Sequence, residues 1–232
     1  MDSVRFDGKI GCYAFVEEKE AQRSSINRPK GTMEVKSIES VTKNVFKSFL
    51  IDKVIPDIKA KWPVKPAKVF IQLDNAKPHC NEKDPDIVAA GTEGGWDIRL
   101  LFQPAKSPDF NVLDLGFFTA IQSLQYKETV RNPAELVQSV NAAFEKLPMI
   151  TLENTFFTLQ TVWGKCIEHC GGNQFKPPHI GKAKLRRQKI LPENLFCDEE
   201  IYNRGIEVLS MMKEDKLFQE KKKASRKQQK KK

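Results

Sequence analysis

The sequence predicts an α/β fold, with a core of mixed strands and helices followed by a helical region. Three observations lead to this prediction. Over residues 1–130, short runs rich in β-branched and aromatic residues alternate with segments whose apolar residues recur at helical spacing. Over residues 131–220 only the helical spacing persists, and residues 221–232 are almost entirely basic. We therefore expect a strand-and-helix domain, a helical region and a disordered basic tail.

The first elements are expected at the following positions. Residues 8–18, GKIGCYAFVEE, read as a strand that begins after the turn signal Asp7-Gly8. Residues 23–37, RSSINRPKGTMEVKS, are polar and contain a proline and a glycine, so they predict a loop or a hairpin. Residues 41–61 carry apolar side chains at helical spacing, and Pro56 is expected to bend or divide that helix.

The next elements alternate between strand and helix. We expect a strand at Val69–Leu73, a short helix over residues 84–90 with a proline in its first turn, and a strand over residues 96–102. A helix is expected from Asn111 to about residue 127. Asn111 is a suitable N-cap, and Asp114 three positions later can complete a capping box and favour the positive end of the helix dipole.

The remaining chain reads as helical with one irregular stretch. Amphipathic helices are expected over residues 133–147 and 152–170, the second ended by a glycine pair. Residues 173–197 contain three prolines and are expected to be irregular. A last helix is expected over residues 198–220.

Composition restricts the classes of function. No apolar stretch is long enough to cross a membrane, the N-terminus has no signal-like apolar region, and five scattered cysteines favour free thiols in a reducing compartment. The net charge is +9, but residues 221–232 contribute eight of those charges, which leaves +1 for the preceding 220 residues.

A basic tail of this kind is either a solvated segment or one that attracts nucleic acid or directs nuclear import. We therefore expect a protein that is nuclear, or cytoplasmic before import, and that is neither secreted nor membrane-bound. The candidate nucleic-acid-binding residues of the tail are Lys221, Lys222, Lys223, Arg226, Lys227, Lys230, Lys231 and Lys232.

Asp74 and Asp114 are the candidate catalytic and metal-binding residues. Asp74 ends the strand run VFIQLD, and Asp114 falls in the first turn of a helix, with residues 75–113 (39 residues) between them. Hard carboxylate ligands on ordered elements are what Mg²⁺ chemistry on phosphates requires. From spacing alone, a turn residue and a helix-start residue would be the commoner explanation.

The surrounding blocks carry a family resemblance. FDGKIG, RSSINRPKGT, IQLDNAKPH, QPAKSPDFNVLDLGFFTAIQSLQ and GGNQFKPPH occur in this order, and together they resemble the C-terminal portion of mariner-like transposases of plants and oomycetes. That group has an Asp, Asp, Asp triad with 39 residues between the second and third members. The resemblance covers roughly residues 6–205.

The resemblance implies an RNase H-like mixed sheet with flanking helices, and cut-and-paste transposition of DNA with two divalent cations, Mg²⁺ or Mn²⁺. It makes Asp74 the second metal ligand and Asp114 the third. Asn75 and His79, in the same DNAKPH block, would lie around the metal or face the substrate.

The family has its first catalytic aspartate and its helix-turn-helix modules upstream of FDGKIG. We therefore expect a truncated domain without its first strand, with little or no catalysis by the chain alone. Asp7, Asp2 and Asp109 are poor substitutes, because they read as a turn residue, a terminal residue and a turn organiser.

Two other functions stay open. One is a non-enzymatic module that binds nucleic acid or pairs with a full-length transposase or a second copy of itself. The other is DNA cleavage with the missing acid supplied by a partner. No small-molecule substrate is indicated.

A cysteine and histidine cluster is a weaker candidate. Cys166, His169 and Cys170 share a helix face with zinc-like spacing, although packed thiols are the commoner explanation. Neighbouring His79 and Cys80 do not suggest a nucleophile and its base.

Overall fold

The structure is a computed structural model that describes residues 6–26, 28–65, 68–172 and 174–229, without the side chains of residues 215–229. The chain forms two compact units, Met1–Glu153 and Asn154–Lys232, and each is described by itself. The first contains every described strand, and helices dominate the second. The α/β class expected from the sequence is confirmed.

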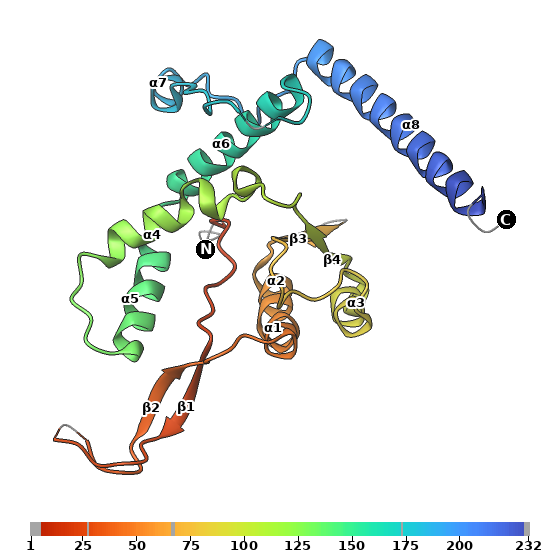
Figure 1. Ribbon diagram of the computed structural model, residues 1–232. Coiled ribbons are helices and arrows are strands. Elements are labelled where there is room, and N and C mark those ends of the chain that lie inside the picture. The colour runs from red at the N-terminus through yellow and green to blue at the C-terminus, as the bar shows by residue number, and fades with distance from the viewer. Residues whose placement is uncertain (1–5, 27, 66–67, 173, 230–232) are drawn as a thin grey trace. The chain divides into compact units, whose positions relative to one another are not determined.

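A β-hairpin follows the N-terminal segment (Figure 1). Strands β1 (Val16–Glu20) and β2 (Met33–Ser37) pair antiparallel, with Val16 opposite Ser37. The backbone N–H of Gly31 donates to the carbonyl of Ala21 at 2.9 Å, and the φ of 86° at Gly31 suits a residue without a Cβ. The hairpin expected within residues 23–37 therefore forms, with β1 as its first strand.

The strand expected over residues 8–18 is wrong for residues 8–15. Ile10 packs against one hydrophobic cluster of the unit and Cys12 against another. Residues 8–15 thus run between two sets of packed elements and lie outside the β-ladders of the described chain. Alternating apolar residues predicted a strand because alternation reports two-sided burial, whether or not a neighbouring strand is present.

A parallel strand pair forms the second sheet. Strands β3 (Val69–Leu73) and β4 (Ile98–Phe102) pair in register, with Val69 opposite Ile98, and helix α3 (Pro85–Thr92) lies between them in sequence. A crossover connection that contains a helix is the usual link between parallel strands. The described strands thus form two separate pairs, rather than the single mixed sheet that the family resemblance implies.

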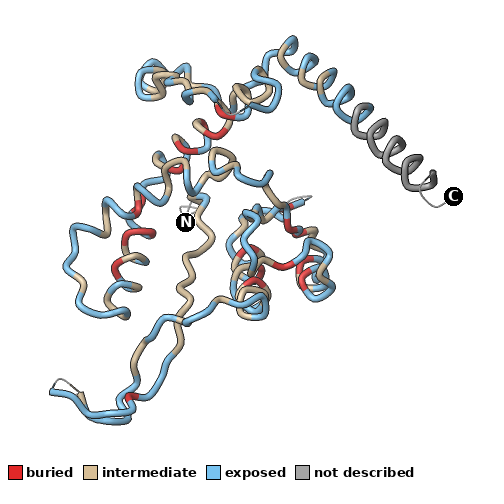
Figure 2. Tube along the Cα trace, viewed as in Figure 1, coloured by how far each residue is buried: buried red, intermediate tan, exposed pale blue. Residues whose placement is uncertain are grey.

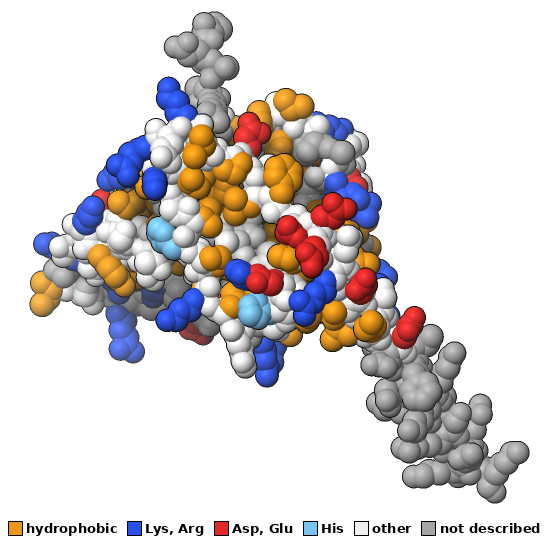
Figure 3. Space-filling model, turned by 90° about the horizontal axis from the view of Figure 1, so that it is seen from above, with side chains coloured by type: hydrophobic (Ala, Val, Ile, Leu, Met, Phe, Trp, Pro, Cys, Tyr) orange, Lys and Arg blue, Asp and Glu red, His pale blue; other side chains and the backbone are white. Residues whose placement is uncertain are grey.

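One face of the β3–β4 pair is buried and the other is exposed. Val69, Ile98 and Leu100 belong to the first hydrophobic cluster, whereas Phe70 and Leu101 on the opposite face are about half exposed. Buried residues are marked red in Figure 2, and in this part of the chain they lie on β3, β4, the adjoining helices and the loop residue Cys80. Hydrophobic side chains also lie at the molecular surface, as the orange side chains in Figure 3 show.

Pro56 divides the first helical segment, as expected. Helix α1 (Lys43–Phe49) passes into a π-helical turn at Leu50–Val54, and α2 (Ile55–Lys61) begins there with Pro56 in its first turn. Proline lacks the N–H of a regular helical bond and its ring clashes with the preceding turn, so the wider π turn relieves both problems.

Helix α3 begins at a residue that both caps it and forms an ion pair. The Asp84 carboxylate accepts hydrogen bonds from the backbone N–H groups of Asp86 at 3.1 Å and Ile87 at 3.5 Å. Lys47 Nζ lies 2.8 Å from the same carboxylate, and its hydrogen bond lowers the pKa of Asp84. The pair joins α1 to α3, and the helix expected near residues 84–90 is confirmed.

The second hydrophobic cluster lies between α4 (Phe118–Gln125) and α5 (Pro133–Lys146). Lys9 stabilises the end of α5, because its side chain is only 8% exposed and its Nζ donates to the carbonyl of Glu145 at 2.8 Å. The carboxylate of Asp7 pairs with this ammonium at 3.0 Å. The FDGK turn therefore stabilises a helix end, which is why Asp7 is not a free metal ligand.

Three helices shape the C-terminal part: α6 (Met149–Glu168), α7 (Lys182–Arg187) and α8 (Glu199–Gln229). The glycine pair ends α6 as expected, since Gly171 has a φ of 90° and its N–H donates to the Cys166 carbonyl at 2.8 Å. The short α7 falls within the stretch expected to be irregular. No helix of the described chain is long and apolar enough to cross a membrane.

The expectation of a disordered tail is wrong for residues 221–229. The backbone of α8 continues as a helix to Gln229, past the end expected near residue 220. Lysine, arginine, glutamine and alanine are all good helix formers, so composition that lacks apolar residues does not exclude a helix. Lys230, Lys231 and Lys232 lie outside the described residues.

Candidate functional site

Asp74 directly follows β3 and is held in a local turn. Its Oδ1 accepts a hydrogen bond from the backbone N–H of Ala76 at 2.9 Å, and half of its side chain (52%) remains exposed. The Nδ1 atom of His79 lies 3.1 Å from this carboxylate and 2.8 Å from the Asp74 carbonyl. The His79 ring also packs on Phe46, with 4.4 Å between centroids, so His79 restricts the rotation of Asp74.

Asp114 lies in a π-helical turn, Leu113–Phe117, ahead of α4. Asn111 stabilises the start of this turn, because its Oδ1 accepts from the Leu113 N–H at 3.0 Å and its carbonyl accepts from the Asp114 N–H at 3.1 Å. The expected capping box is wrong: the backbone N–H of Asn111 donates to the carbonyl of Pro108 at 2.9 Å instead. The Asp114 carboxylate is therefore exposed and available to a ligand.

The two aspartates line one open cleft of about 320 Å³. β3 ends just before Asp74 and β4 just before Gln103, and Asp114 comes from the helical turn that follows. Carboxyl ends of parallel strands are where α/β sheets bind ligands. The cleft is lined by Asp74, Asn75, Ala76, Gln103, Pro104, Lys106, Ser107, Pro108 and Asp114.

A network of side-chain amides fixes the loop that carries Asp114. Gln72 Nε2 donates to the carbonyl of Phe110 at 2.7 Å and lies 3.2 Å from Gln103 Oε1. Asn75 Nδ2 donates to the Gln103 carbonyl at 2.8 Å, and Gln103 Nε2 donates to the Ser107 carbonyl at 3.2 Å. Asn75 therefore connects the two strand ends across the cleft.

Sequence reasoning singled out Asn75 but missed Gln72 and Gln103. A weak signal for them was present, because each is an amide near the C-terminal end of a mostly apolar strand run. Gln72 is on the exposed face of β3, from which it reaches the loop before Asp114. The geometry of that loop was not readable from the sequence.

The cleft suits one hydrated divalent cation better than two. Mg²⁺ is commonly held by one or two carboxylates with water completing its octahedron, and Asp74 and Asp114 supply that number. Among the described residues, no three His, Cys, Asp or Glu side chains are grouped to hold a metal ion. Lys106, with a φ of 59°, also lines the cleft and would repel a second cation while attracting a phosphate.

The zinc-like spacing in α6 does not produce a three-residue site. His169 stacks on Phe175 with 5.4 Å between ring centroids, whereas Cys166 and Cys170 line a separate pocket of about 270 Å³ with residues of α8. Burial raises the pKa of the Cys166 thiol, which disfavours the thiolate that binds zinc. Cys80 is fully buried and its Sγ lies 3.6 Å from the Lys43 carbonyl, as expected of a structural thiol.

The basic-tail candidates cannot be placed as a site. The side chains of Lys221, Lys222, Lys223, Arg226 and Lys227 lie outside the described ones, as do all atoms of residues 230–232. Comparisons of the chain with protein-family models, with curated proteins and with solved structures gave no match. The residues of the cleft are therefore the basis for assigning a function.

Proposed function

We propose that residues 6–130 are part of an RNase H-like catalytic domain that cuts and joins DNA strands with the help of Mg²⁺ or Mn²⁺, as mariner-like transposases do. The observation that carries the proposal is the meeting of Asp74 and Asp114 in one cleft. Their shared cleft favours a common ligand over two unrelated structural roles. The parallel pair β3–β4 with its intervening α3 would form part of the catalytic sheet.

Four residues of the cleft and the adjacent His79 have a part in this proposal. Asp74 and Asp114 would hold the cation, which when bound supplies a polarised water or DNA hydroxyl and stabilises the leaving oxygen. His79 keeps the Asp74 carboxylate oriented through its Nδ1 atom. Lys106 attracts the negatively charged phosphodiester group into the cleft, and Asn75 fixes the distance between the strand ends.

The proposal includes a third carboxylate in addition to those of Asp74 and Asp114. Two carboxylates neutralise one cation, and a second cation beside Lys106 needs further negative charge. The family resemblance assigns that role to an aspartate on another strand. We propose that a further polypeptide segment supplies it, so that the chain alone binds metal and DNA but cuts DNA slowly or not at all.

Linkage between metal and DNA binding tests the proposed function. If the cation bridges the carboxylates to a phosphate, a short DNA duplex will raise the affinity for Mn²⁺, and Mn²⁺ will raise the affinity for the duplex by the same factor. We expect a factor of about 5–150, as is usual for coupled sites. Electron paramagnetic resonance of free Mn²⁺ and fluorescence anisotropy of the duplex measure the two sides.

The control for linkage is Asp52→Asn, which removes an exposed carboxylate outside the cleft. This variant should keep the full coupling, and Asp74→Asn should lose it. Duplex binding that is independent of Mn²⁺ in the unaltered chain would support the non-enzymatic nucleic-acid-binding module and contradict the proposal.

A further inference from the structure

Positive charge is concentrated in one stretch of the C-terminal unit, apart from the basic tail. Between Glu168 and Glu193 the sequence contains no acidic residue. This stretch includes α7 and carries six basic side chains, Lys176, Lys182, Lys184, Arg186, Arg187 and Lys189. The net charge of residues 1–220 is close to zero, so it does not reveal this local excess of basic residues.

The inward side of α7 is anchored to α6. Lys182 Nζ donates to the carbonyl of Asn154 at 2.6 Å and to Thr158 Oγ1 at 2.7 Å. Arg186 donates to Asn154 Oδ1 at 3.0 Å. Burial lowers the pKa of Lys182, in keeping with its structural position. These two residues, four positions apart, fix which side of α7 faces outward.

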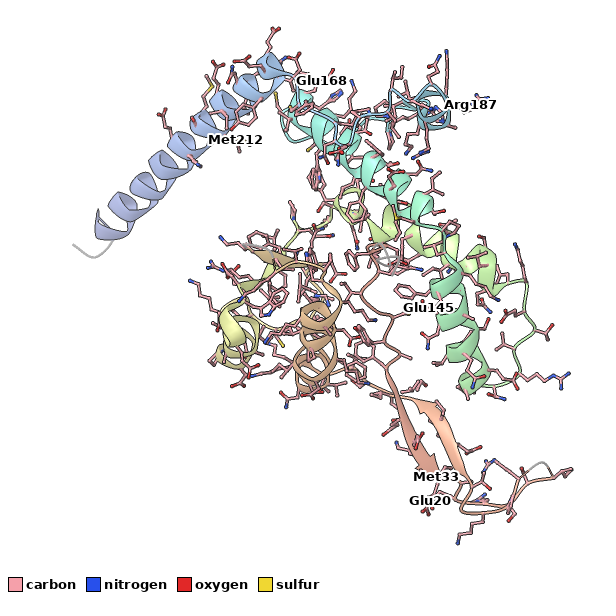
Figure 4. The ribbon with its side chains drawn as sticks, turned by 180° about the vertical axis from the view of Figure 1, so that it is seen from behind. Glu20, Met33, Glu145, Glu168, Arg187 and Met212 are labelled. Atoms are coloured by element: carbon pink, nitrogen blue, oxygen red, sulfur yellow. The ribbon has the colours of Figure 1, made fainter. Side chains whose placement is uncertain are left out.

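The outward side of α7 carries unpaired positive charge. Lys184 and Arg187 are three positions apart and exposed, so they are neighbours on the helix surface. Neither makes an ion pair with an acidic residue of the described chain, and neither do Lys176 and Lys189 nearby. Arg187 is labelled at the outer edge of α7 in Figure 4. Like charges at this spacing are unfavourable unless an anion lies against them.

Lys189 extends the same surface past the end of the helix. Its backbone has a φ of 57°, and the next residue, Ile190, donates its N–H to the Leu185 carbonyl at 3.1 Å, which closes the helix end. The turn leaves the Lys189 side chain exposed two residues beyond the end of α7. The chain therefore presents a short row of cations on an anchored support.

We propose that Lys184, Arg187 and Lys189 form a contact surface for the phosphate backbone of a nucleic acid. The exposed positions of α7 are Ala183, Lys184 and Arg187, which include no large apolar side chain. A helix that lies on a lipid surface needs such side chains on its buried face, so a nucleic acid fits this surface better than a membrane. The surface is independent of the Asp74 and Asp114 cleft.

The test uses the full chain in EDTA, so that the metal site does not contribute. Binding of a fluorescent 20-base-pair duplex is measured by anisotropy over a range of salt concentrations for the double variant Lys184→Gln, Arg187→Gln. Each phosphate contact contributes about 0.9 to the slope of log affinity against log salt. We expect the slope to fall by about 2 and the affinity to fall about tenfold near physiological salt.

The matched control is Lys30→Gln, Lys127→Gln, which removes two exposed lysines of the other unit that make no ion pair in the described chain. An equal loss of affinity in the control would show that the loss comes from the lower net charge of the chain, and it would overturn the proposal. So would unchanged binding by the α7 variant with a normal circular dichroism spectrum. Asp52→Asn, outside both the cleft and α7, should leave this metal-free binding unchanged. Because EDTA removes the cation, failure of this test is separate from failure of the proposed metal site.

Two further binding measurements identify which phosphate-bearing partner the surface prefers. A single-stranded RNA of equal length tests whether the surface prefers duplex DNA, and vesicles containing phosphatidylserine test a lipid surface. Loss of vesicle binding with full retention of DNA and RNA binding in the α7 variant would contradict a nucleic-acid surface.

Discussion

Asp74→Asn or Asp114→Asn is expected to lower the affinity of the chain for Mn²⁺ by about 100-fold. Each substitution keeps the size of the side chain and removes one of the two carboxylates that line the cleft. Changing even the partners that orient a metal ligand costs about 10–100-fold in affinity, so loss of a ligand should reach the upper end of that range. Free Mn²⁺, followed by electron paramagnetic resonance, gives the affinity directly.

The controls for this prediction separate ligation from general charge. Asp52→Asn removes the same charge outside the cleft, and its effect on Mn²⁺ affinity should stay within about twofold. The double variant at positions 74 and 114 should bind little more weakly than either single variant, because one carboxylate leaves a poor site. Independent, additive losses would show that the two aspartates bind separate ions.

Gly91→Ala is expected to destabilise the first unit by about 1–3 kcal/mol, the usual cost of overpacking a core. Gly91 is buried in α3, where the backbone of β4 approaches closely. A methyl group there would overlap the carbonyl oxygen of Ile98, and backbone atoms cannot rotate away as a side chain does. Denaturant unfolding followed by circular dichroism measures the loss.

Gly164→Ala provides the control, because it is expected to stabilise the protein rather than destabilise it. Gly164 is inside α6 and a Cβ there would meet no atom within 4 Å. Replacing glycine by alanine in an open helical position stabilises by about 0.5–1 kcal/mol. If Gly91→Ala were equally harmless, the close packing of α3 on β4 would be wrong, and with it the support of the cleft.

The local elements were largely predictable because their signals are local. Val69–Leu73 was expected as a strand and forms one, since its β-branched and aromatic residues are bounded by prolines and polar residues. Pro56 and the glycine pair after α6 marked helix boundaries for reasons of backbone geometry that tertiary contacts do not change.

The failures concern partners that the sequence does not specify. Residues 8–15 alternate like a strand, but Ile10 and Cys12 pack on different clusters and no ladder forms there. Asp114 had the right spacing for a capping box, yet the Asn111 N–H found the carbonyl of Pro108. In each case the side-chain pattern is present, but the backbone pairing that it predicts does not form.

The candidate site was also predictable only in part. Asp74, Asn75, His79 and Asp114 were identified by residue type and by the blocks around them, and three of these four line the cleft. Gln72 and Gln103 were missed because their importance lies in contacts across 31 and 38 positions of sequence. The basic surface of α7 was missed because net charge was summed over too long a segment.

Iron-directed cleavage of the polypeptide tests most directly whether Asp74 and Asp114 hold one cation. Fe²⁺ bound in place of Mg²⁺, with ascorbate and peroxide, generates radicals that cut the backbone beside the metal. If one cation is shared, we expect cuts near residue 74 and within residues 103–114 of the same protein, both suppressed by excess Mg²⁺ and both lost in Asp74→Asn. Cuts at only one of these segments, or at both in Asp74→Asn, would contradict a shared site.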